Sequence, residues 1–538
     1  MDPPLAKVLR IVVLVVMAQT ACLGDFLTKD RAATSRYLGS PEFAARKAAL
    51  SRPGSRGVLV PAGGRAQMAG AYLLLRFMRE ALHSSLPAEV VYNGPGELDA
   101  RMRGFLASLP NVTLVDGSAV ALPPHHSTSQ SAALKHGWSF KVWALCYATS
   151  FTQVLMIDAD NTPLVPPETL FDTPQWRAHG NLFWPDFMRG GEGILWKPLP
   201  GIFRKLGLPV PWEGPGGDAH RTVESGQVLL DRGAHADVLE WLWYMNSHHA
   251  DWKAELHGDK DTFEIAFMLA NKTAEFAQVK VHARQALGYV KHEDKYHHRG
   301  MIQHAPDGRL AFHHRTSGAK VMEHCSGDER GVEGCRVVYI TSQLSIEQTM
   351  KCSHQAWTWN SHDVDVNAWD NLICTHNSSS VPAPASNAGQ PAAAGHRKLA
   401  VWWLPGSKKT PAHPPPPLPN TWMSWSTHRT NFTSRPASGP MNPSPAAEYN
   451  GPGEFLGPGI TCRRMADRSG VWWGTKLSVF PVEVFGKEGQ RIQQSYALFE
   501  LLREELRKDW PSPSTSPSKG RRMMGRGMPG HARMRDDA

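Results

Sequence analysis

The sequence lacks the patterns that would place it in several common classes of protein. It has only seven cysteines in 538 residues, and none of them shows the spacing of a zinc site. No other nucleic-acid-binding signature is present. The net charge of +9 does not replace one, because part of it comes from a basic tail at 516–538. We therefore expect no nucleic-acid partner.

The N-terminus also lacks a run of about 20 apolar residues, the length that a membrane span needs. Lys7 and Arg10 precede a shorter apolar run at 11–18, and small residues follow it. This order is typical of a secretory signal peptide. Residues 1–24 are therefore predicted to be a signal peptide, or a signal anchor if they are not cleaved, with an N-terminal core helix as the alternative.

What the sequence does have, from residue 57 on, is a regular alternation of apolar strands and helices. Four apolar runs have the length of a strand, at 57–61, 88–92, 112–116 and 154–158. Helical patterns separate them, at 65–84, 94–109 and 137–149. Repeated βαβ units predict an α/β fold, with a Rossmann-like, mostly parallel sheet and helices on both faces. Ligands bind beyond the carboxyl ends of the strands in such sheets.

Composition divides the rest of the chain. The predicted segments are a lead or stem at 25–56, a catalytic domain at 57–345, a cysteine-containing extension at 346–376, a Pro/Ser/Ala-rich linker at 377–460, a short ordered segment at 461–508 and a disordered basic tail at 509–538. Within the catalytic domain, a Pro-Asp-Gly turn at 306–308 predicts a hairpin between 301–304 and 310–314. The ordered C-terminal segment contains a predicted helix at 490–507.

Two aspartates directly follow the fourth apolar run, in VLMIDADN (154–161). Carboxylate oxygens suit hard cations such as Mn²⁺ or Mg²⁺, which also bind substrate phosphates. Asp158 and Asp160 are therefore predicted to hold a metal ion that bridges a diphosphate and neutralises charge on the leaving group.

The same pattern allows a different class of enzyme. Asp158-x-Asp160-x-Thr162 is also the nucleophile motif of haloacid-dehalogenase-type phosphatases, in which Asp158 would attack phosphorus and Asp160 would act as acid and base. The acidic segment 258–261 loosely resembles their metal motif. Three predicted strands precede Asp158, however, whereas that family opens its domain with the nucleophile strand. A non-catalytic protein that binds glycans or metal stays open as a third possibility.

Several longer segments resemble one family specifically. These are FKVWAL (140–145), SFTQVLMIDADNTPLVPPETLF (150–171), GNLFWPDF (180–187), ESGQVLLD (224–231), GDKDTFEIAF (258–267) and MIQHAPDGRLAFHHRT (301–316). In this order they are similar to the fungal-type α-mannosyltransferases of glycosyltransferase family 71. The looser pattern also resembles the glycogenin-like family 8. The resemblance covers roughly residues 55–320 and implies the type A glycosyltransferase fold.

The resemblance also implies roles for individual residues. Asp158, Asp160 and His314 would be the metal ligands, with the neighbouring His313 as a position easily confused with His314. The implied donor contacts are Lys141, Asp158, Asp160, Asn161 and Lys320. Trp184 and Asp186 are candidates to line the acceptor or sugar pocket, because an aromatic face packs on the apolar side of a sugar ring. Packing of Trp184 in the hydrophobic core is the alternative. The remaining candidates for catalysis are Glu224, Asp259 and Asp261.

From the same resemblance, the expected activity is transfer of mannose from GDP-mannose to a mannose-containing glycan or glycoprotein, with Mn²⁺ or Mg²⁺ and with retained anomeric configuration. A UDP-sugar-dependent transferase of the glycogenin-like type is the alternative. The expected location is the Golgi lumen, as a single-pass type II protein bound to the membrane through the uncleaved N-terminal segment, or a lumenal or secreted protein after cleavage.

Overall fold

The computed structural model describes residues 30–52, 54–121, 137–189, 200–213, 220–252, 255–256, 258–290, 295–315, 336–341 and 477–509, together with five short strands between 358 and 464. The predicted signal segment, most of the linker, the basic tail and Lys320 lie outside the described residues. No helix in the described part of the chain is both long and apolar enough to cross a membrane.

The central sheet has six strands in the order β3-β2-β1-β4-β7-β6. Their bounds are β1 (Arg56–Pro61), β2 (Ala88–Tyr92), β3 (Val112–Asp116), β4 (Gln153–Ile157), β6 (Asn181–Arg189) and β7 (Arg221–Asp231). The first four strands in the chain pair in parallel, whereas β7 runs antiparallel to both β4 and β6. The four predicted strands are confirmed, each to within one residue, and the α/β class is confirmed with them.

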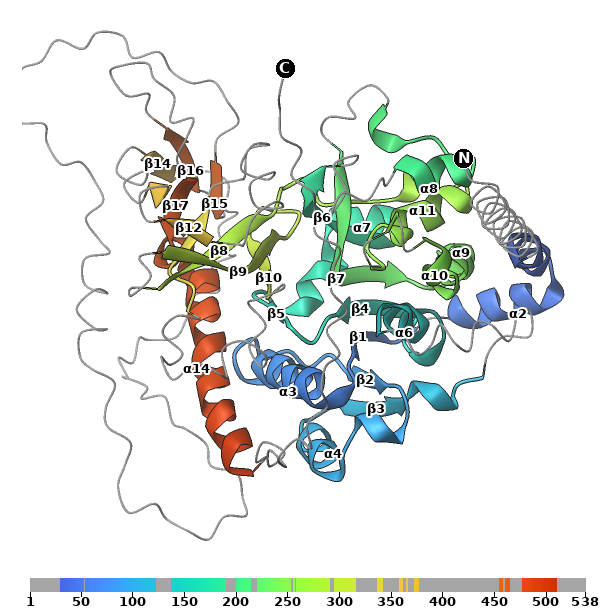
Figure 1. The fold of residues 1–538 in the computed structure, drawn as a ribbon, viewed down its shortest axis with the longest axis horizontal. Helices are drawn as coiled ribbons and strands as arrows, with labels where there is room; N and C mark the ends of the chain where they lie inside the picture. The colour runs from blue at the N-terminus through green and yellow to red at the C-terminus, as the bar shows by residue number, and fades with distance from the viewer. Residues whose placement is uncertain are drawn as a thin grey trace, which may run out of the picture.

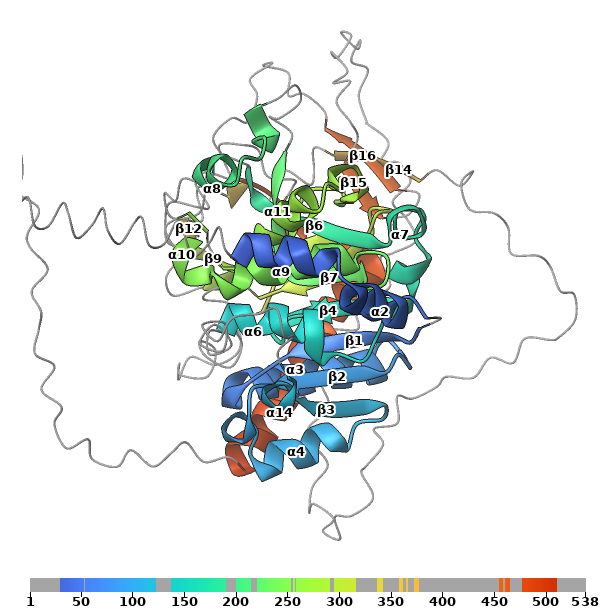
Figure 2. The same cartoon turned by 90° about the vertical axis from the view of Figure 1, so that its right-hand side faces the viewer.

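Each face of this sheet carries a hydrophobic core, because successive strand residues point to opposite faces. Val58 and Leu155 join a core with α3 (Gly64–Glu80), α4 (Ala100–Ala107) and α14 (Gly486–Asp509). Leu59 and Val154 join the other, with α6 (Gly137–Trp143), α9 (Ala236–Ser247) and α11 (Thr262–Leu269). Figures 1 and 2 show these helices on opposite sides of the sheet. Helices on both faces were predicted and are confirmed.

Further α-helices are α2 (Pro41–Leu50), α7 (Pro174–His179), α8 (Pro200–Lys205) and α10 (His249–Trp252). A second sheet has the order β13-β17-β11-β8-β9-β10-β5, and β12 pairs with β9. Its strands are β5 (Asn161–Pro163), β8 (Arg284–Val290), β9 (Lys295–His304), β10 (Leu310–His314), β11 (Tyr339–Thr341), β12 (Thr358–Asn360), β13 (Val364–Asp365) and β17 (Leu477–Pro481). The predicted hairpin is the antiparallel pair of β9 and β10. A third sheet contains β14 (Leu372–His376), β15 (Glu454–Gly457) and β16 (Ile460–Arg464).

One helix begins later than predicted. The pattern predicted a helix over 94–109, but the structure has a 3₁₀ turn at Pro95–Glu97 and an α-helix only from Ala100. Gly94 has a φ of +90°, a left-handed conformation that interrupts the chain before the helix. Asp99 then caps the helix, since its carboxylate accepts the N–H groups of Arg101 and Met102.

Two segments that the composition had set apart pack on the catalytic domain. In the predicted stem, Arg46 of α2 lies 3.1 Å from the buried carboxylate of Glu240 and donates to the carbonyl of Cys146. At the other end of the chain, α14 packs beside α3, and its Leu498 and Phe499 belong to the same core as α3 (Figure 1). The folded unit therefore combines both segments with the central domain.

Candidate active site

The loop after β4 presents the two predicted aspartates at the carboxyl end of a buried strand. The N–H of Asp158 donates to the carbonyl of Gly226 (2.9 Å), and the N–H of Asn161 donates to the carbonyl of Asp158 (2.9 Å). The second bond closes a tight turn between β4 and β5, and the first fastens this turn to β7 (Arg221–Asp231). The side chains of Asp158 and Asp160 remain partly exposed, at 26% and 23%. They can therefore reach a ligand while their backbone is held by the sheet.

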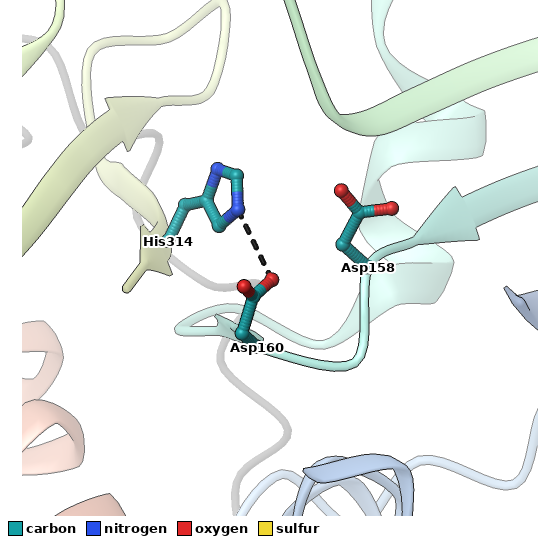
Figure 3. A group of neighbouring side chains, drawn as sticks. All are labelled: Asp158, Asp160 and His314. Atoms are coloured by element: carbon teal, nitrogen blue, oxygen red, sulfur yellow. Dashed lines mark hydrogen bonds and ion pairs between the residues drawn. The ribbon is translucent and has the colours of Figure 1, made fainter. Parts of the chain in front are cut away.

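His314 completes a group of three ligands with these aspartates (Figure 3). β10 pairs with β5 so that His314 lies opposite Asn161, and the Nε2 atom of His314 lies 3.1 Å from Oδ1 of Asp160. One ligand atom from each of Asp158, Asp160 and His314 lies within 4.8 Å of the others. Two carboxylates and an imidazole in this arrangement suit a divalent cation such as Mn²⁺. These residues therefore fit the predicted metal.

His313 points away from this group. Its Nε2 atom lies 2.7 Å from the carbonyl oxygen of Arg299, and the side chain is fully buried. Burial, with the nearby charge of Arg315, lowers the pKa of His313 well below its usual value. The family resemblance had implied His314 rather than the adjacent His313 as the ligand, and of these two histidines the structure brings His314 to the aspartates.

Glu224 lies behind His314. Its Oε1 atom is 2.9 Å from Nδ1 of His314, in a close ion pair with poor hydrogen-bond alignment, and it accepts the N–H of Gly226 (2.6 Å). Burial opposes the charge on both side chains, but their attraction dominates. It lowers the pKa of Glu224 and, together with Asp160, raises the pKa of His314 well above its usual value. Glu224 therefore orients the ring of His314 from the side opposite Asp160.

Lys141 is buried beside Asp158 rather than extended into solvent. Its Nζ atom donates to Asp158 (2.9 Å) and to the carbonyl of Ser225 (2.6 Å), and it lies 3.5 Å from Asp259. Burial favours the neutral amine, yet the attraction of Asp158 and Asp259 raises the pKa of Lys141 above its usual value. A fixed positive charge thus lies next to the two aspartates, at the place predicted for a donor contact.

A second buried charge cluster includes the other predicted carboxylates. Lys260 lies 2.8 Å from Asp261 and 3.3 Å from Asp186. Burial raises the pKa of Asp186 to about 6, although Lys260 partly offsets it. Asp259 faces the other way and accepts a hydrogen bond from the Ser225 hydroxyl (3.1 Å). Asp259 therefore belongs to the Lys141 side of the site, whereas Asp186 and Asp261 share Lys260.

Two predicted contacts have structural roles instead. Trp184 is fully buried in the core, where its indole N–H donates to the carbonyl of His304 (2.7 Å) and its ring packs on Phe312. It has no exposed face for a sugar, so the prediction that it lines the pocket is wrong. The side chain of Asn161 is buried as well, and it donates to the carbonyl of Gly226 (2.9 Å) and to Gln227 (2.6 Å). It fastens β5 to β7, which leaves no free face for the predicted donor contact.

Two glycines near the site were not predicted to matter. A Cβ atom at Gly226 would lie 2.3 Å from Nδ1 of His314, and one at Gly70 of α3 would lie 2.5 Å from the carbonyl oxygen of Ala159. Both positions need glycine, because the histidine ring and the metal loop come that close. Gly226 was visible within ESGQVLLD, while an isolated glycine in the helical pattern was the only signal for Gly70.

Comparison with protein-family models matches residues 55–192 and 216–305 to a family described as "Mannosyltransferase putative". The chain is 25% identical over 291 residues to alpha-1,2-mannosyltransferase MNN23 of Candida albicans, covering 47% of this chain and 46% of that protein. It is 27% identical over 280 residues to alpha-1,2-mannosyltransferase MNN2 of Saccharomyces cerevisiae, covering 46% and 45%. The matched region is therefore similar to this mannosyltransferase family.

The resemblance expected from the sequence segments is thereby confirmed. The chain spans about half the length of the curated relatives it matches. Among solved structures, the mannosyltransferase Ktr4p from S. cerevisiae in complex with GDP is similar with a TM-score of 0.29 at 10% identity, covering 58% of this chain and 93% of that one. The family match ends at residue 305, so His314 and the C-terminal helix lie beyond it.

Proposed function

We propose that this chain is a metal-dependent retaining α-mannosyltransferase that moves mannose from GDP-mannose to a mannose-containing glycan or glycoprotein. The observation that carries the proposal is the group of Asp158, Asp160 and His314, at the carboxyl end of the central strand of a mannosyltransferase-family domain. The donor and the acceptor are those that the family resemblance implies.

Asp158, Asp160 and His314 would hold the cation, which neutralises charge on the departing diphosphate when it is bound. Glu224 keeps the ring of His314 turned toward Asp160. Lys141 supplies a second, permanent positive charge beside Asp158, which favours negative charge on a phosphate bound nearby. A fixed charge of this kind costs no reorganisation during the reaction, which is why such electrostatic stabilisation is effective.

The remaining carboxylates are our candidates for contacts with the sugars. Asp259 lies next to Lys141, and Asp186 and Asp261 flank Lys260, so each is held in a defined position by a cation. We propose them as acceptors of hydrogen bonds from donor or acceptor hydroxyls. Asp259 and Asp261 stay candidates for catalysis, whereas Glu224 acts through His314.

The phosphatase alternative receives no support from the fold. Its nucleophile would follow the first strand of the domain, but β4 is the fourth strand in chain order and lies between β1 and β7. In addition, Asp158 is paired with Lys141.

We propose a Golgi location, with membrane attachment through residues 1–24 if these are not cleaved. The proposal rests on the charged and apolar pattern of that segment. Expression of the full chain, followed by N-terminal sequencing of the mature protein, tests it. A start at Met1 or Asp2 in a membrane-bound protein supports an anchor, and a start near residue 25 supports cleavage.

A substrate screen tests the proposed activity. The purified chain with Mn²⁺ is given GDP-mannose, several UDP-sugars or p-nitrophenyl phosphate, with and without methyl α-mannoside, and nucleotide and phosphate release are measured. We expect GDP release from GDP-mannose alone, increased by the mannoside. Turnover restricted to a UDP-sugar would assign a different donor, and phosphate release from the phosphoester would favour a phosphatase. No turnover of any substrate would indicate a non-catalytic protein.

A further inference from the structure

The C-terminal helix α14 reaches the metal loop through one buried arginine. Arg315 directly follows His314, and only 2% of its surface is exposed. Its two terminal nitrogens donate to the hydroxyls of Thr162 (2.6 Å) and Ser495 (2.7 Å), and its guanidinium carbon lies 5.1 Å from the ring centre of Tyr496. Thr162 is in β5, whereas Ser495 and Tyr496 are in α14. Arg315 therefore joins the strand after the aspartates to a helix 180 residues away in sequence.

The backbone of Arg315 is fastened to the same loop. Its N–H donates to the carbonyl of Asp160 (3.0 Å), next to the antiparallel pair of His314 and Asn161. A second side chain, Arg491 of α14, donates to the carbonyl of Leu164 (2.6 Å), the residue after β5. Both ends of β5 are thus fastened to α14. One end is bound by Arg315, which α14 holds in place, and the other by Arg491, which belongs to α14.

Among the described residues, the partners of Arg315 hold it in position but carry no opposite charge. They are two hydroxyl oxygens and an aromatic ring, and a guanidinium presents its donors in a rigid planar fork. The Ser495 hydroxyl donates to the carbonyl of Ile492 (2.7 Å), so its oxygen is turned toward Arg315. Losing either hydroxyl leaves a buried N–H group of Arg315 without a hydrogen-bond partner. This lowers the stability of the folded state, because the loss of hydration is then not offset by a hydrogen bond.

We propose that Arg315, held by Ser495 and Tyr496 of α14, is a positioning residue that sets the separation between Asp160 and His314. The C-terminal helix is then a working part of the metal site, although it lies outside the matched family region. The expected effect on Mn²⁺ binding rests on the proposed function. The contacts by which Arg315 holds the metal loop do not depend on a metal.

Paired variants of the full chain test the proposal. Ser495→Ala and Thr162→Val each remove one hydroxyl, while Ser495→Thr and Thr162→Ser keep it. Gln494→Ala changes an exposed neighbour on the same helix and is the matched control. Calorimetric titration with Mn²⁺ measures affinity, and thermal unfolding without metal measures stability. We expect about tenfold weaker Mn²⁺ binding for the Ala and Val variants, the size of effect known for outer partners of metal ligands, and near wild-type binding for the other three.

Hydrogen exchange supplies a second readout that needs no metal. We expect the amide of Asn161 and that of Arg315 to exchange faster in Ser495→Ala than in Ser495→Thr. A lower melting temperature with unchanged Mn²⁺ affinity and unchanged exchange at these amides would overturn the proposal, because α14 would then stabilise the fold only. If the wild-type chain binds no Mn²⁺, the proposed function fails. The exchange of these amides still decides whether Arg315 braces the loop.

Discussion

Asp158 and Asp160 are two residues apart, yet their side chains have different partners. Asp158 faces Lys141, whereas Asp160 faces His314. The cation site therefore has one carboxylate balanced by a permanent charge and one balanced by a titratable ring. This difference makes Asp160 the cleaner position to test, because its replacement does not remove the nearest counter-charge of a buried lysine.

The first prediction concerns that residue. Asp160→Asn keeps the shape of the side chain but removes a charged ligand. We expect Mn²⁺ affinity to fall by at least about 100-fold, since losing even an outer partner of a ligand costs about 10–100-fold. Calorimetric titration measures it. Asp172→Asn, at a surface carboxylate that is 60% exposed, is the control and should bind like wild type. Equal affinities for the two variants would place the metal elsewhere.

The second prediction concerns pH. Asp160 and Glu224 raise the pKa of His314 well above its usual value, and burial raises the pKa of Asp158. Without metal, the ring of His314 therefore holds a proton that a cation must displace. Mn²⁺ affinity should increase from pH 6 to pH 8, by about tenfold per unit for each proton released. Titrations in buffers of different ionisation enthalpy count these protons. An affinity that does not change with pH would contradict the assigned ligands.

At the scale of elements, the close approach of α3 to the metal loop depends on one glycine. A methyl group at Gly70 would press on the backbone of Ala159, which cannot rotate away as a side chain could. In α4, Gly104 has no atom within 4 Å of the corresponding position. Substitution by alanine is therefore expected to have opposite effects on stability at these two glycines.

The third prediction uses this pair. Gly70→Ala should lower the free energy of unfolding by about 1–3 kcal/mol through overpacking and should weaken Mn²⁺ binding. Gly104→Ala should be neutral or stabilise by up to about 1 kcal/mol, because alanine loses less backbone entropy in a helix. Denaturant unfolding measures both. A Gly70→Ala protein as stable as wild type would mean that α3 does not press on the loop.

The strands were predictable because apolar runs of strand length stand between turn residues. The run at 154–158 even located Asp158 at a strand end, since β4 stops at Ile157. β7 was missed because the polar residues Glu224, Ser225 and Gln227 interrupt its pattern, although all three are buried in the structure. They are buried in contact with Lys141, His314 and Asn161, and a pattern of apolar residues cannot show such contacts.

The site was predictable only as far as its residue types allowed. The aspartates were found from their position, and His314 was assigned in preference to His313 from the family resemblance. The pairing of β10 with β5 then shows why His314 reaches the aspartates. Trp184 was misassigned because the sequence does not show which aromatic faces are covered. The role of Arg315 could not be predicted, because its partner Ser495 is 180 residues away and lies outside the segments that resemble the family.

At the scale of the whole molecule, the N-terminal and C-terminal segments enclose the domain. α2 docks through Arg46, which lies 4.4 Å from the ring centre of Tyr147 and pairs with a carboxylate that has no exposed surface. α14 closes the opposite side of the sheet. The boundaries drawn from composition therefore do not mark the limits of the folded unit.

The fourth prediction tests the docking of α2. Arg46→Ala leaves the carboxylate of Glu240 buried without its cation, which should lower the free energy of unfolding by about 3–5 kcal/mol. Arg36→Ala, at an exposed position nearby in the chain, should change it by less than about 0.5 kcal/mol. Denaturant unfolding of the two variants gives the difference. Equal stabilities would show that the segment before β1 does not pack on the domain.

The proposed activity is tested most directly by mannose transfer from GDP-mannose to methyl α-mannoside while Mn²⁺ is returned to the EDTA-treated chain. We expect no transfer before the metal is added, a saturable increase with Mn²⁺, and little transfer at any Mn²⁺ concentration for Asp160→Asn. Transfer that continues in EDTA, or that is equal in Asp160→Asn and wild type, would contradict a metal-dependent reaction at Asp158, Asp160 and His314.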